Sequence, residues 1–262
     1  MTLRTIAGGA ELRVVADASA LATTAAESIV AAAERAVAER GAFHLCSTGG
    51  STPAAIYAAL RSTAFASRMP WRQTTIWLGD DRFVPRSDPH SNLAAIDAVL
   101  LAPHADGSAA PMSTAHVEAW PTETPNADDA ARSYAARATA ALSINESGVP
   151  IFDLVLIGIG GDGHCLSVFP GSPLTAPDAP IAAGVAAPTH IEPHLPRLSF
   201  SLRILAAARA VLTLAAGAAK GEVLARIIDG GEPIATLPAK AALLPAATWL
   251  LDEAAASKLT GR

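Results

Sequence analysis

The sequence predicts an α/β fold with a mainly parallel central sheet flanked by helices, Rossmann-like in arrangement and forming a single domain over residues 1–262. Stretches typical of strands alternate with stretches typical of helices along the chain. Hydrophobic residues make up 51% of the sequence, whereas aromatic residues make up 5%. This composition favours alanine-rich helices that pack closely on a sheet, and no shift in composition marks a domain boundary.

The expected elements begin with a short strand at residues 12–15 and a long alanine-rich helix at residues 18–40. Gly41 stands where that helix is expected to end, because glycine readily adopts the left-handed conformation found there. A strand at 42–46 leads into a helix at 54–60, and Pro53 suits its first turn, where a missing N–H costs nothing. The other expected strands are 75–78, 117–120, 152–157, 197–204, 211–215 and 248–251, and the other expected helices are 93–101, 128–142, 218–228 and a terminal helix.

Several classes of protein are excluded by composition. The formal net charge is −5 with no basic run, so neither nucleic acid nor a membrane is an expected partner. The N-terminal residues lack the apolar segment of a signal peptide, and Arg209 interrupts the longest apolar stretch, so we predict a cytoplasmic protein. Cys46 and Cys165 fit no metal-site spacing and are expected to be buried as small apolar side chains.

Three polar loops follow three consecutive strongly predicted strands. They read STGGSTP (47–53), GDDRFVP (79–85) and GIGGDGH (158–164). In parallel α/β sheets, ligands bind in the crevice beyond the carboxyl ends of the strands. We therefore expect these loops to converge on one site.

The third loop contains the spacing G-x-G-x-x-G over residues 158–163, which also occurs in dinucleotide-binding turns. Such a turn must open a long helix, and the proline and glycine at 170–171 come too soon for one. The favoured alternative is a sharp exit from the strand that displays Asp162 and His164 at the sheet edge. A histidine can accept a proton from water near neutral pH, so His164 is a candidate general base; a purely structural histidine is the other possibility.

The first loop lacks the lysine of a triphosphate-binding loop, so no nucleotide is expected. Its backbone N–H groups at Gly49, Gly50 and Ser51, with the hydroxyls of Thr48, Ser51 and Thr52, can form an anion site. The helix that begins near this loop favours a phosphate group through its dipole. An ordinary strand–helix turn is the alternative.

The second loop carries Asp80, Asp81 and Arg82. These residues can form a solvated loop with a surface ion pair, which is the plain alternative. As a functional set, one aspartate can orient His164 and Arg82 can bind an oxyanion, so we place all three at the substrate site. No second cluster of ligands supports a metal, and none is expected.

Together these stretches closely resemble the 6-phosphogluconolactonase family, whose fold is shared with glucosamine-6-phosphate deaminases. The resemblance covers nearly the whole chain, and the pair D-G-H-x-x-S-x-F-P-G with G-D-x-R-x-V-P is highly specific. The matching segments are TGGSTP, WLGDDRFVP, HSN at 90–92, FDLVLIGIGGDGHCLSVFPG, PRLSF at 196–200, GAAKGEVL at 217–224 and TWLLDEAAA.

The resemblance implies hydrolysis of 6-phosphoglucono-δ-lactone in the pentose phosphate pathway, with no nucleotide and no required metal, so no cofactor is expected. A monomer or small homo-oligomer is expected, and the sequence does not choose between them. It implies that His164 is the general base and that Arg82 lies close to the lactone. Arg197 and Lys220 would join the loop of residues 48–51 around the phosphate of the sugar phosphate. No G-x-S-x-G segment is present, which agrees with direct attack by water.

The sequence departs from the family pattern at a few positions. Asp81 stands where the family usually has the longer glutamate, which leaves its role open. Cys165 and Leu166 replace small or hydroxyl residues, Thr48 replaces a serine, and RLS replaces RIT. Whether Asp162 or a loop aspartate fixes the tautomer of the histidine is also left open.

Two other functions are conceivable for such a chain. One is an amino-sugar phosphate deaminase or isomerase on the same fold, which carries a D-E-Y type motif where this chain has Asp80, Asp81 and Arg82. The arginine favours the lactonase. The other is a sugar-phosphate sensor domain of a transcription regulator, which needs a DNA-binding helix pair that we do not find in the sequence.

Overall fold

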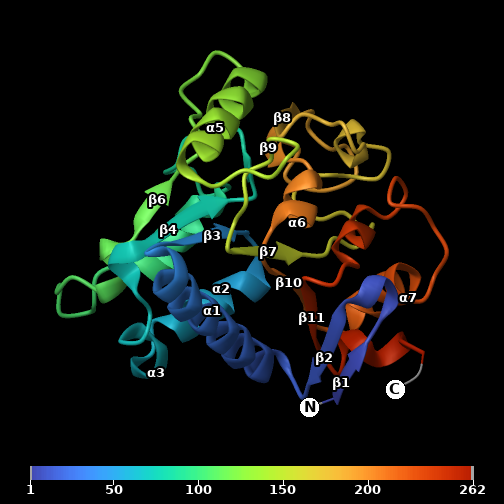
Figure 1. Cartoon of the computed structure of the whole chain (residues 1–262), viewed down its shortest axis with the longest axis horizontal. Coiled ribbons are helices and arrows are strands. Elements are labelled where there is room, and N and C mark those ends of the chain that lie inside the picture. Colours follow the sequence, from blue (N-terminus) through green and yellow to red (C-terminus); the bar gives the residue numbers. More distant parts are fainter. Residues whose placement is uncertain (1, 261–262) are drawn as a thin grey trace.

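The computed structural model describes residues 2–260 and contains two sheets, the larger with eight strands in the order β1-β2-β11-β10-β7-β3-β4-β6 (Figure 1). Neighbouring strands in this sheet are parallel except for the antiparallel edge pair β1 and β2. The predicted mainly parallel sheet is thus confirmed. Its strands are β1 (Thr2–Thr5), β2 (Glu11–Val15), β3 (Phe43–Ser47), β4 (Thr74–Leu78), β6 (His116–Glu118), β7 (Leu154–Gly158), β10 (Val211–Ala215) and β11 (Ala247–Asp252).

The chain changes direction across the sheet between β3 and β7, which lie side by side at its centre. From β3 it proceeds outward through β4 to β6, whereas from β7 it proceeds through β10 to β11 on the other side. Such a switch point leaves a crevice beyond the carboxyl ends of the two central strands. The first and third polar loops leave the sheet at this crevice.

Seven α-helices accompany the sheets within residues 2–260. The longest, α1 (Ala18–Arg40), has the predicted bounds: Asp17 caps its start by accepting a hydrogen bond from Ala20 N at 2.8 Å, and Gly41 ends it with φ 78°. The others are α2 (Ser51–Leu60), α3 (Thr63–Ala66), α4 (Asn92–Ile96), α5 (Ala127–Ala141), α6 (Arg203–Ala207) and α7 (Gly221–Ile228).

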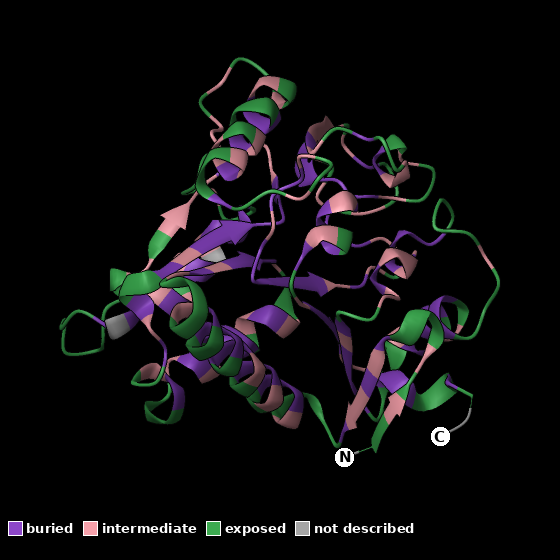
Figure 2. Cartoon of the chain, in the orientation of Figure 1, coloured by how far each residue is buried: buried purple, intermediate pink, exposed green. Residues whose placement is uncertain are grey.

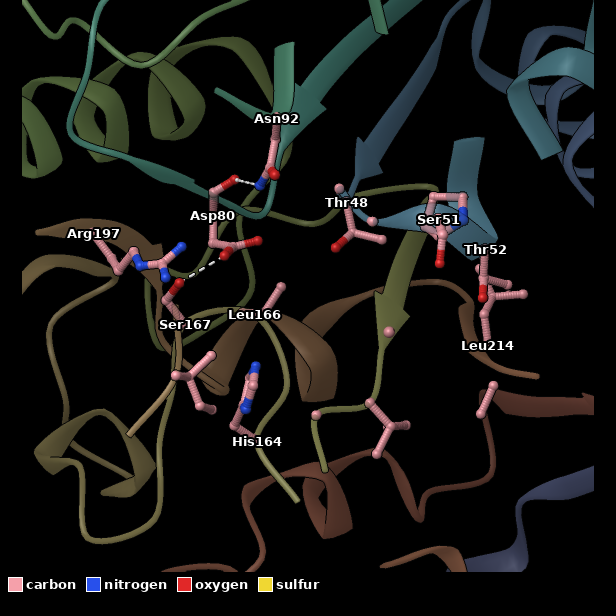
Figure 3. A pocket seen from close by; sticks show the side chains of 18 of the residues that line it. Thr48, Ser51, Thr52, Asp80, Asn92, His164, Leu166, Ser167, Arg197 and Leu214 are labelled. Atoms are coloured by element: carbon pink, nitrogen blue, oxygen red, sulfur yellow. Dashed lines mark hydrogen bonds between the residues drawn. The ribbon is translucent and has the colours of Figure 1, made fainter. Parts of the chain in front are cut away.

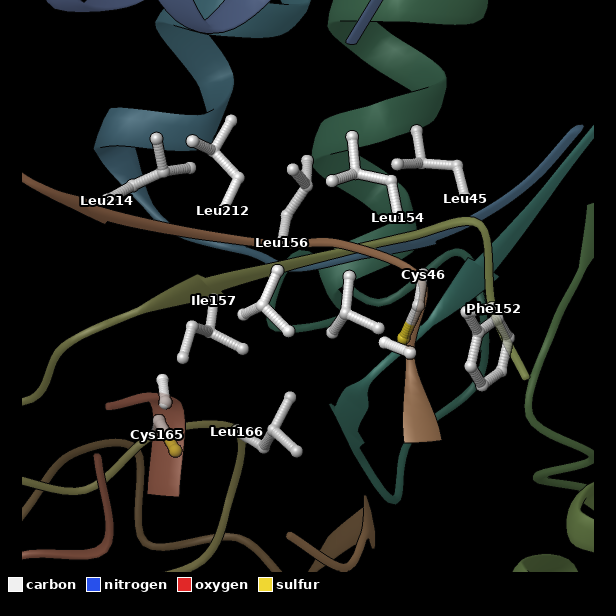
Figure 4. Close-up of a cluster of buried hydrophobic side chains, with 14 of the residues drawn as sticks. Leu45, Cys46, Phe152, Leu154, Leu156, Ile157, Cys165, Leu166, Leu212 and Leu214 are labelled. Carbon is white, nitrogen blue, oxygen red and sulfur yellow. The ribbon is translucent and has the colours of Figure 1, made fainter. Parts of the chain in front are cut away.

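The central strands are buried, while the outer faces of the long helices are exposed (Figure 2). Leu154 and Leu212 point toward helices on one side of the sheet, and Ile157 points to the other side, near Cys165 (Figure 4). Because both faces are covered, β7 is an apolar run rather than an alternating one. The prediction that both cysteines are buried is confirmed.

A second sheet, which the sequence did not reveal, has three antiparallel strands in the order β5-β9-β8. Its strands are β5 (Asp80–Arg82), β8 (Ala182–Val185) and β9 (Arg197–Phe200), and α5 packs against it. We expected residues 79–85 and 170–196 to be loops, which was wrong for β5 and β8. Both strands are short and pair only with β9, so neither shows a periodic pattern by itself.

Other elements also differ from those expected. The strand predicted over 197–204 ends at Phe200, and Arg203 begins α6. All four residues of β9 are buried, so the alternating pattern in the sequence does not correspond to one buried and one exposed face. Strand β1 was missed, because its residues are mostly exposed at the sheet edge. The predicted terminal helix is a single 3₁₀ turn, Ala255–Lys258.

Candidate active site

A cavity of about 240 Å³ lies beyond the carboxyl ends of the central strands and receives residues from all three polar loops. The predicted convergence of the loops is confirmed. Figure 3 shows Thr48, Ser51 and Thr52 on one side of the pocket, Arg197 on the other, and His164 facing the space between them. Nine of the predicted site residues line the pocket: Thr48, Gly49, Gly50, Ser51, Asp80, Arg82, His164, Arg197 and Lys220.

The loop between β3 and α2 presents its backbone to the pocket. Gly50 has φ 111°, a conformation that favours glycine, and α2 begins at the next residue. Tyr57 Oη donates a hydrogen bond of 2.7 Å to the carbonyl of Thr48, which ties the loop to its own helix. A Cβ on Gly49 would lie 1.9 Å from Asn92 Oδ1, so only glycine fits there. The loop therefore offers backbone N–H groups and hydroxyls at a helix N-terminus, where an anion is stabilised.

The glycine loop after β7 is a tight turn rather than the start of a long helix. Gly163 has φ 89°, and Gly160 N donates to the carbonyl of His164 at 2.9 Å. The next helical element is the 3₁₀ turn Pro173–Thr175. The long helix that a dinucleotide site requires does not follow this turn, which supports the alternative that the turn displays His164.

Asp162 holds the ring of His164, and His164 Nδ1 lies 2.5 Å from Asp162 Oδ1. Because an ionised carboxylate only accepts hydrogen bonds, this contact makes Nδ1 the donor and leaves Nε2 with a free lone pair. Burial alone would raise the pKa of Asp162, but hydrogen bonds from His164 and His190 hold it well below its usual range. The carboxyl group is therefore ionised near neutral pH and supports an imidazole that can take up a proton.

Two guanidinium groups face the pocket from neighbouring strands. Arg82 in β5 and Arg197 in β9 are directly opposite in the register of the small sheet. Arg82 Nη1 donates to Asn92 Oδ1 at 3.0 Å and to the carbonyl of His90 at 2.7 Å. Burial, and then the positive charge of Arg82, lower the pKa of Arg197. Two cations brought this close are stabilised by an anion between them.

Both arginines retain hydrogen-bonding capacity. In the described part of the chain, the Nε atoms of Arg82 and Arg197 are buried and have no acceptor. Lys220 also reaches the pocket, and its Nζ donates to the carbonyl of Ile159 at 2.7 Å, which leaves further donors on the ammonium group. The site thus combines three cations with unused donors.

Asp80 and Ser167 also line the pocket. Ser167 Oγ donates to Asp80 Oδ2 at 2.6 Å, and Asn92 Nδ2 donates to the carbonyl of Asp80 at 2.9 Å. Asp80 is buried and lines the pocket. Its carboxylate is an acceptor that suits the hydroxyl groups of a sugar.

Two predicted site residues do not line the pocket. Asp162 stands behind His164 and reaches the pocket only through that ring. Asp81, which we expected at the substrate site, lies behind the pocket wall. Its carboxylate accepts hydrogen bonds from the backbone N–H groups of Arg82 and Asn92 at 2.7 Å and from Ser91 Oγ at 2.9 Å. These contacts tie β5, which carries Arg82, to the start of α4.

The burial of Asp81 predicts a pH dependence of the stability of the fold. Burial raises the pKa of Asp81 from 3.8 to about 6, despite its three hydrogen bonds. A group with a raised folded-state pKa stabilises the fold less as the pH rises through that value. Asp81→Asn does not titrate, so its free energy of unfolding should increase relative to that of the parent by about 1 kcal/mol between about pH 5 and about pH 8. Urea unfolding at both pH values measures this; a difference that shrinks with rising pH would contradict it.

Sequence reasoning missed several contributors to the site. Asn92 holds Arg82, Ser167 binds Asp80, and Phe169 packs against the ring of His164 with centroids 4.8 Å apart. Asn92 and Ser167 fall within the segments that carried the family resemblance, which was the available signal. No short-range pattern marked His190, whose Nε2 lies 3.0 Å from Asp162 Oδ2.

No group of three or more His, Cys, Asp or Glu side chains within residues 2–260 is arranged to hold a metal ion. No helix in this range has the length and apolar character needed to cross a membrane.

Comparison with known proteins places this pocket in a family. The model of the family described as glucosamine-6-phosphate isomerases/6-phosphogluconolactonase matches residues 16–250. A 6-phosphogluconolactonase of Streptomyces coelicolor is 33% identical over 256 residues, which cover 95% of this chain and 94% of the relative. The human GDH/6PGL endoplasmic bifunctional protein is 37% identical over 201 residues, which cover 76% of this chain and 24% of that longer protein.

Among solved structures, the crystal structure of the devB protein superposes with a TM-score of 0.78 at 28% identity. The superposition covers 95% of this chain and 99% of the other. The family match, residues 16–250, includes every residue that lines the pocket. The chain belongs to the family of glucosamine-6-phosphate isomerases and 6-phosphogluconolactonases.

Proposed function

We propose that this chain hydrolyses 6-phosphoglucono-δ-lactone to 6-phosphogluconate, with water activated by His164. The observation that carries the proposal is one pocket in which an Asp162-bound imidazole faces two arginines and a lysine. The Streptomyces coelicolor relative named 6-phosphogluconolactonase, which matches along almost its whole length, supports the choice of substrate.

The phosphate of the substrate would bind between the loop of residues 48–51, Arg197 and Lys220. The loop supplies N–H groups at the start of α2, and the two cations supply charge-assisted hydrogen bonds. Binding the remote phosphate orients the lactone ring toward His164. Asp80 is placed to accept hydrogen bonds from sugar hydroxyl groups.

The chemistry requires no covalent intermediate, because a δ-lactone is already an activated ester. His164 Nε2 takes a proton from water while the water oxygen bonds to the lactone carbonyl carbon. Arg82 stabilises the negative oxygen of the tetrahedral intermediate, a contribution of about 3 kcal/mol for one good donor. The bond from that carbon to the ring oxygen then breaks, and the proton on His164 passes to the departing ring oxygen. The products are a carboxylic acid, which ionises, and a free hydroxyl group.

The direct test is a lactone hydrolysis assay with the spontaneous reaction subtracted, since this lactone opens by itself. We expect acceleration by the protein that is unchanged by a chelator. A rate equal to the spontaneous one would overturn the proposal. Loss of the acceleration on adding the chelator would show that a metal takes part.

Lys220→Met should mainly raise KM. The substitution keeps the apolar stem and removes the ammonium group that would hold the phosphate. Loss of one charge-assisted hydrogen bond is worth about 1.5–3 kcal/mol, so KM should rise roughly 10- to 100-fold with kcat little changed. Lys240→Met is the control, because its ammonium group binds the carbonyls of Arg226 and Gly230 away from the pocket. A fall in kcat at unchanged KM would put Lys220 near the reacting carbon instead.

The family also contains glucosamine-6-phosphate isomerases, so a deaminating activity is the alternative within this fold. Ammonia release from glucosamine 6-phosphate would detect it, and we expect none, because Arg82 occupies the motif position that favours the lactonase. The sensor-domain alternative predicts salt-dependent DNA binding, for which the acidic chain is unsuited. A cytoplasmic location and a monomer or small homo-oligomer stay predictions from the sequence.

A further inference from the structure

A second histidine reaches the carboxylate behind the candidate base. His190 lies between β8 and β9, outside every loop that pointed to the site, and its Nε2 is 3.0 Å from Asp162 Oδ2. Asp162 Oδ1 meanwhile contacts Nδ1 of His164 at 2.5 Å. We propose that His190 is a positioning residue, which fixes the carboxylate of Asp162 and through it the ring of His164.

The two contacts together restrict the carboxylate more than either one alone. A carboxylate bound through one oxygen can turn about its bond to Cβ, and the ring that depends on it turns as well. Here each oxygen of Asp162 has its own imidazole partner, and Oδ1 also accepts the backbone N–H of His164 at 3.1 Å. Groups that hold a ligand or base from behind in this way fix both its orientation and its tautomer.

Phe169 completes the arrangement, because it packs against both imidazole rings. Its ring centroid is 4.8 Å from that of His164 and 5.7 Å from that of His190, the latter in an edge-on geometry of 78°. The side chain of Asp162 is 20% exposed, whereas that of His190 is 52% exposed. The outer histidine thus lies toward solvent, and the inner one faces the pocket.

His190 also joins the pocket rim to the base. The next two residues, Ile191 and Glu192, line the pocket, and the carbonyl of Pro193 accepts a hydrogen bond of 2.9 Å from Arg197 Nη2. The contact between His190 and Asp162 therefore fixes the position of residues 191–192 relative to the ring of His164. Residues 186–196 have no regular structure, so contacts such as this one and the hydrogen bond from Arg197 hold the segment in place.

The positioning role of His190 rests on the proposed function, because it concerns His164 as the general base. His190→Ala should lower kcat about tenfold while KM changes little, since loss of a supporting contact typically costs 10- to 100-fold in activity. His190→Gln keeps an N–H donor for Asp162 and should recover most of that loss. His194→Ala is the matched control: it removes a contact in the same segment, between His194 Nδ1 and the carbonyl of Pro188 at 2.7 Å, without touching Asp162.

A second readout does not depend on turnover. The Nδ1 proton of His164, followed by NMR, should exchange faster with water in His190→Ala than in the parent or in His194→Ala. Equal kcat values for His190→Ala and His194→Ala, with an unchanged proton signal, would overturn the positioning role. A changed proton signal in a protein without lactonase activity would refute the proposed function and leave the positioning role supported.

Discussion

Replacing His164 with glutamine is expected to lower kcat for lactone hydrolysis about 100- to 10,000-fold, which is the usual contribution of a general base. A glutamine amide fills similar space and can contact Asp162, but it cannot accept a proton from water near neutral pH. KM should change little, because the phosphate is held by the loop of residues 48–51, Arg197 and Lys220. Steady-state kinetics with the spontaneous rate subtracted measures both parameters.

The same substitution should have little effect on the stability of the fold. His164 lies at the pocket surface with 19% of its side chain accessible, and a glutamine can keep a hydrogen bond to Asp162. We expect the free energy of unfolding to fall by no more than about 1 kcal/mol, because the glutamine keeps a hydrogen bond to Asp162. A kcat within a few-fold of the parent, in a protein that unfolds normally, would refute the role of His164 as the base.

Replacing Gly160 with alanine should lower kcat about 100-fold without removing any functional group. A Cβ at this position would lie 2.0 Å from His164 Nδ1 and 2.7 Å from Asp162 Oδ1. These distances are far shorter than van der Waals contact, so the ring must leave its place against the carboxylate. A displacement of about 1 Å at a reacting group can cost 100-fold in rate.

The neighbouring glycine supplies a matched control for this prediction. A Cβ at Gly161 meets no atom within 4 Å, and its φ lies outside the left-handed range. Gly161→Ala should therefore keep the parent kcat, although it makes the same chemical change one residue away. Equal kcat values for the two alanine variants would mean that the position of the His164 ring does not limit the rate.

The three polar loops were accessible to prediction because each follows a strand whose apolar run is unmistakable. Residues 43–47, 74–78 and 154–158 are buried strands, and a parallel sheet brings their carboxyl ends together whatever else the chain does. His164, Arg82 and Thr48 could therefore be assigned to one pocket. The family resemblance added Arg197 and Lys220, which lie on separate elements and carry no local pattern of their own.

The role of Asp81 could not be read in the same way. It lies next to Asp80, yet Asp80 lines the pocket and Asp81 lies behind its wall. Successive residues of a strand point to opposite sides, and these two belong to β5, a strand of three residues. A loop, as expected there, would have imposed no such alternation. The different positions of the two aspartates therefore depend on the small sheet, which the sequence did not reveal.

The sequence by itself determined the α/β class, the direction of the main strands and the loops that meet at their ends. These features depend on periodicity and on glycine and proline positions, which act over a few neighbouring residues. Tertiary structure alone decided that Arg82 and Arg197 lie opposite each other, and that His190 reaches Asp162 from 28 positions away. Such contacts depend on how segments far apart in the sequence pack together. The residue pattern of either segment alone does not reveal which distant segment it contacts.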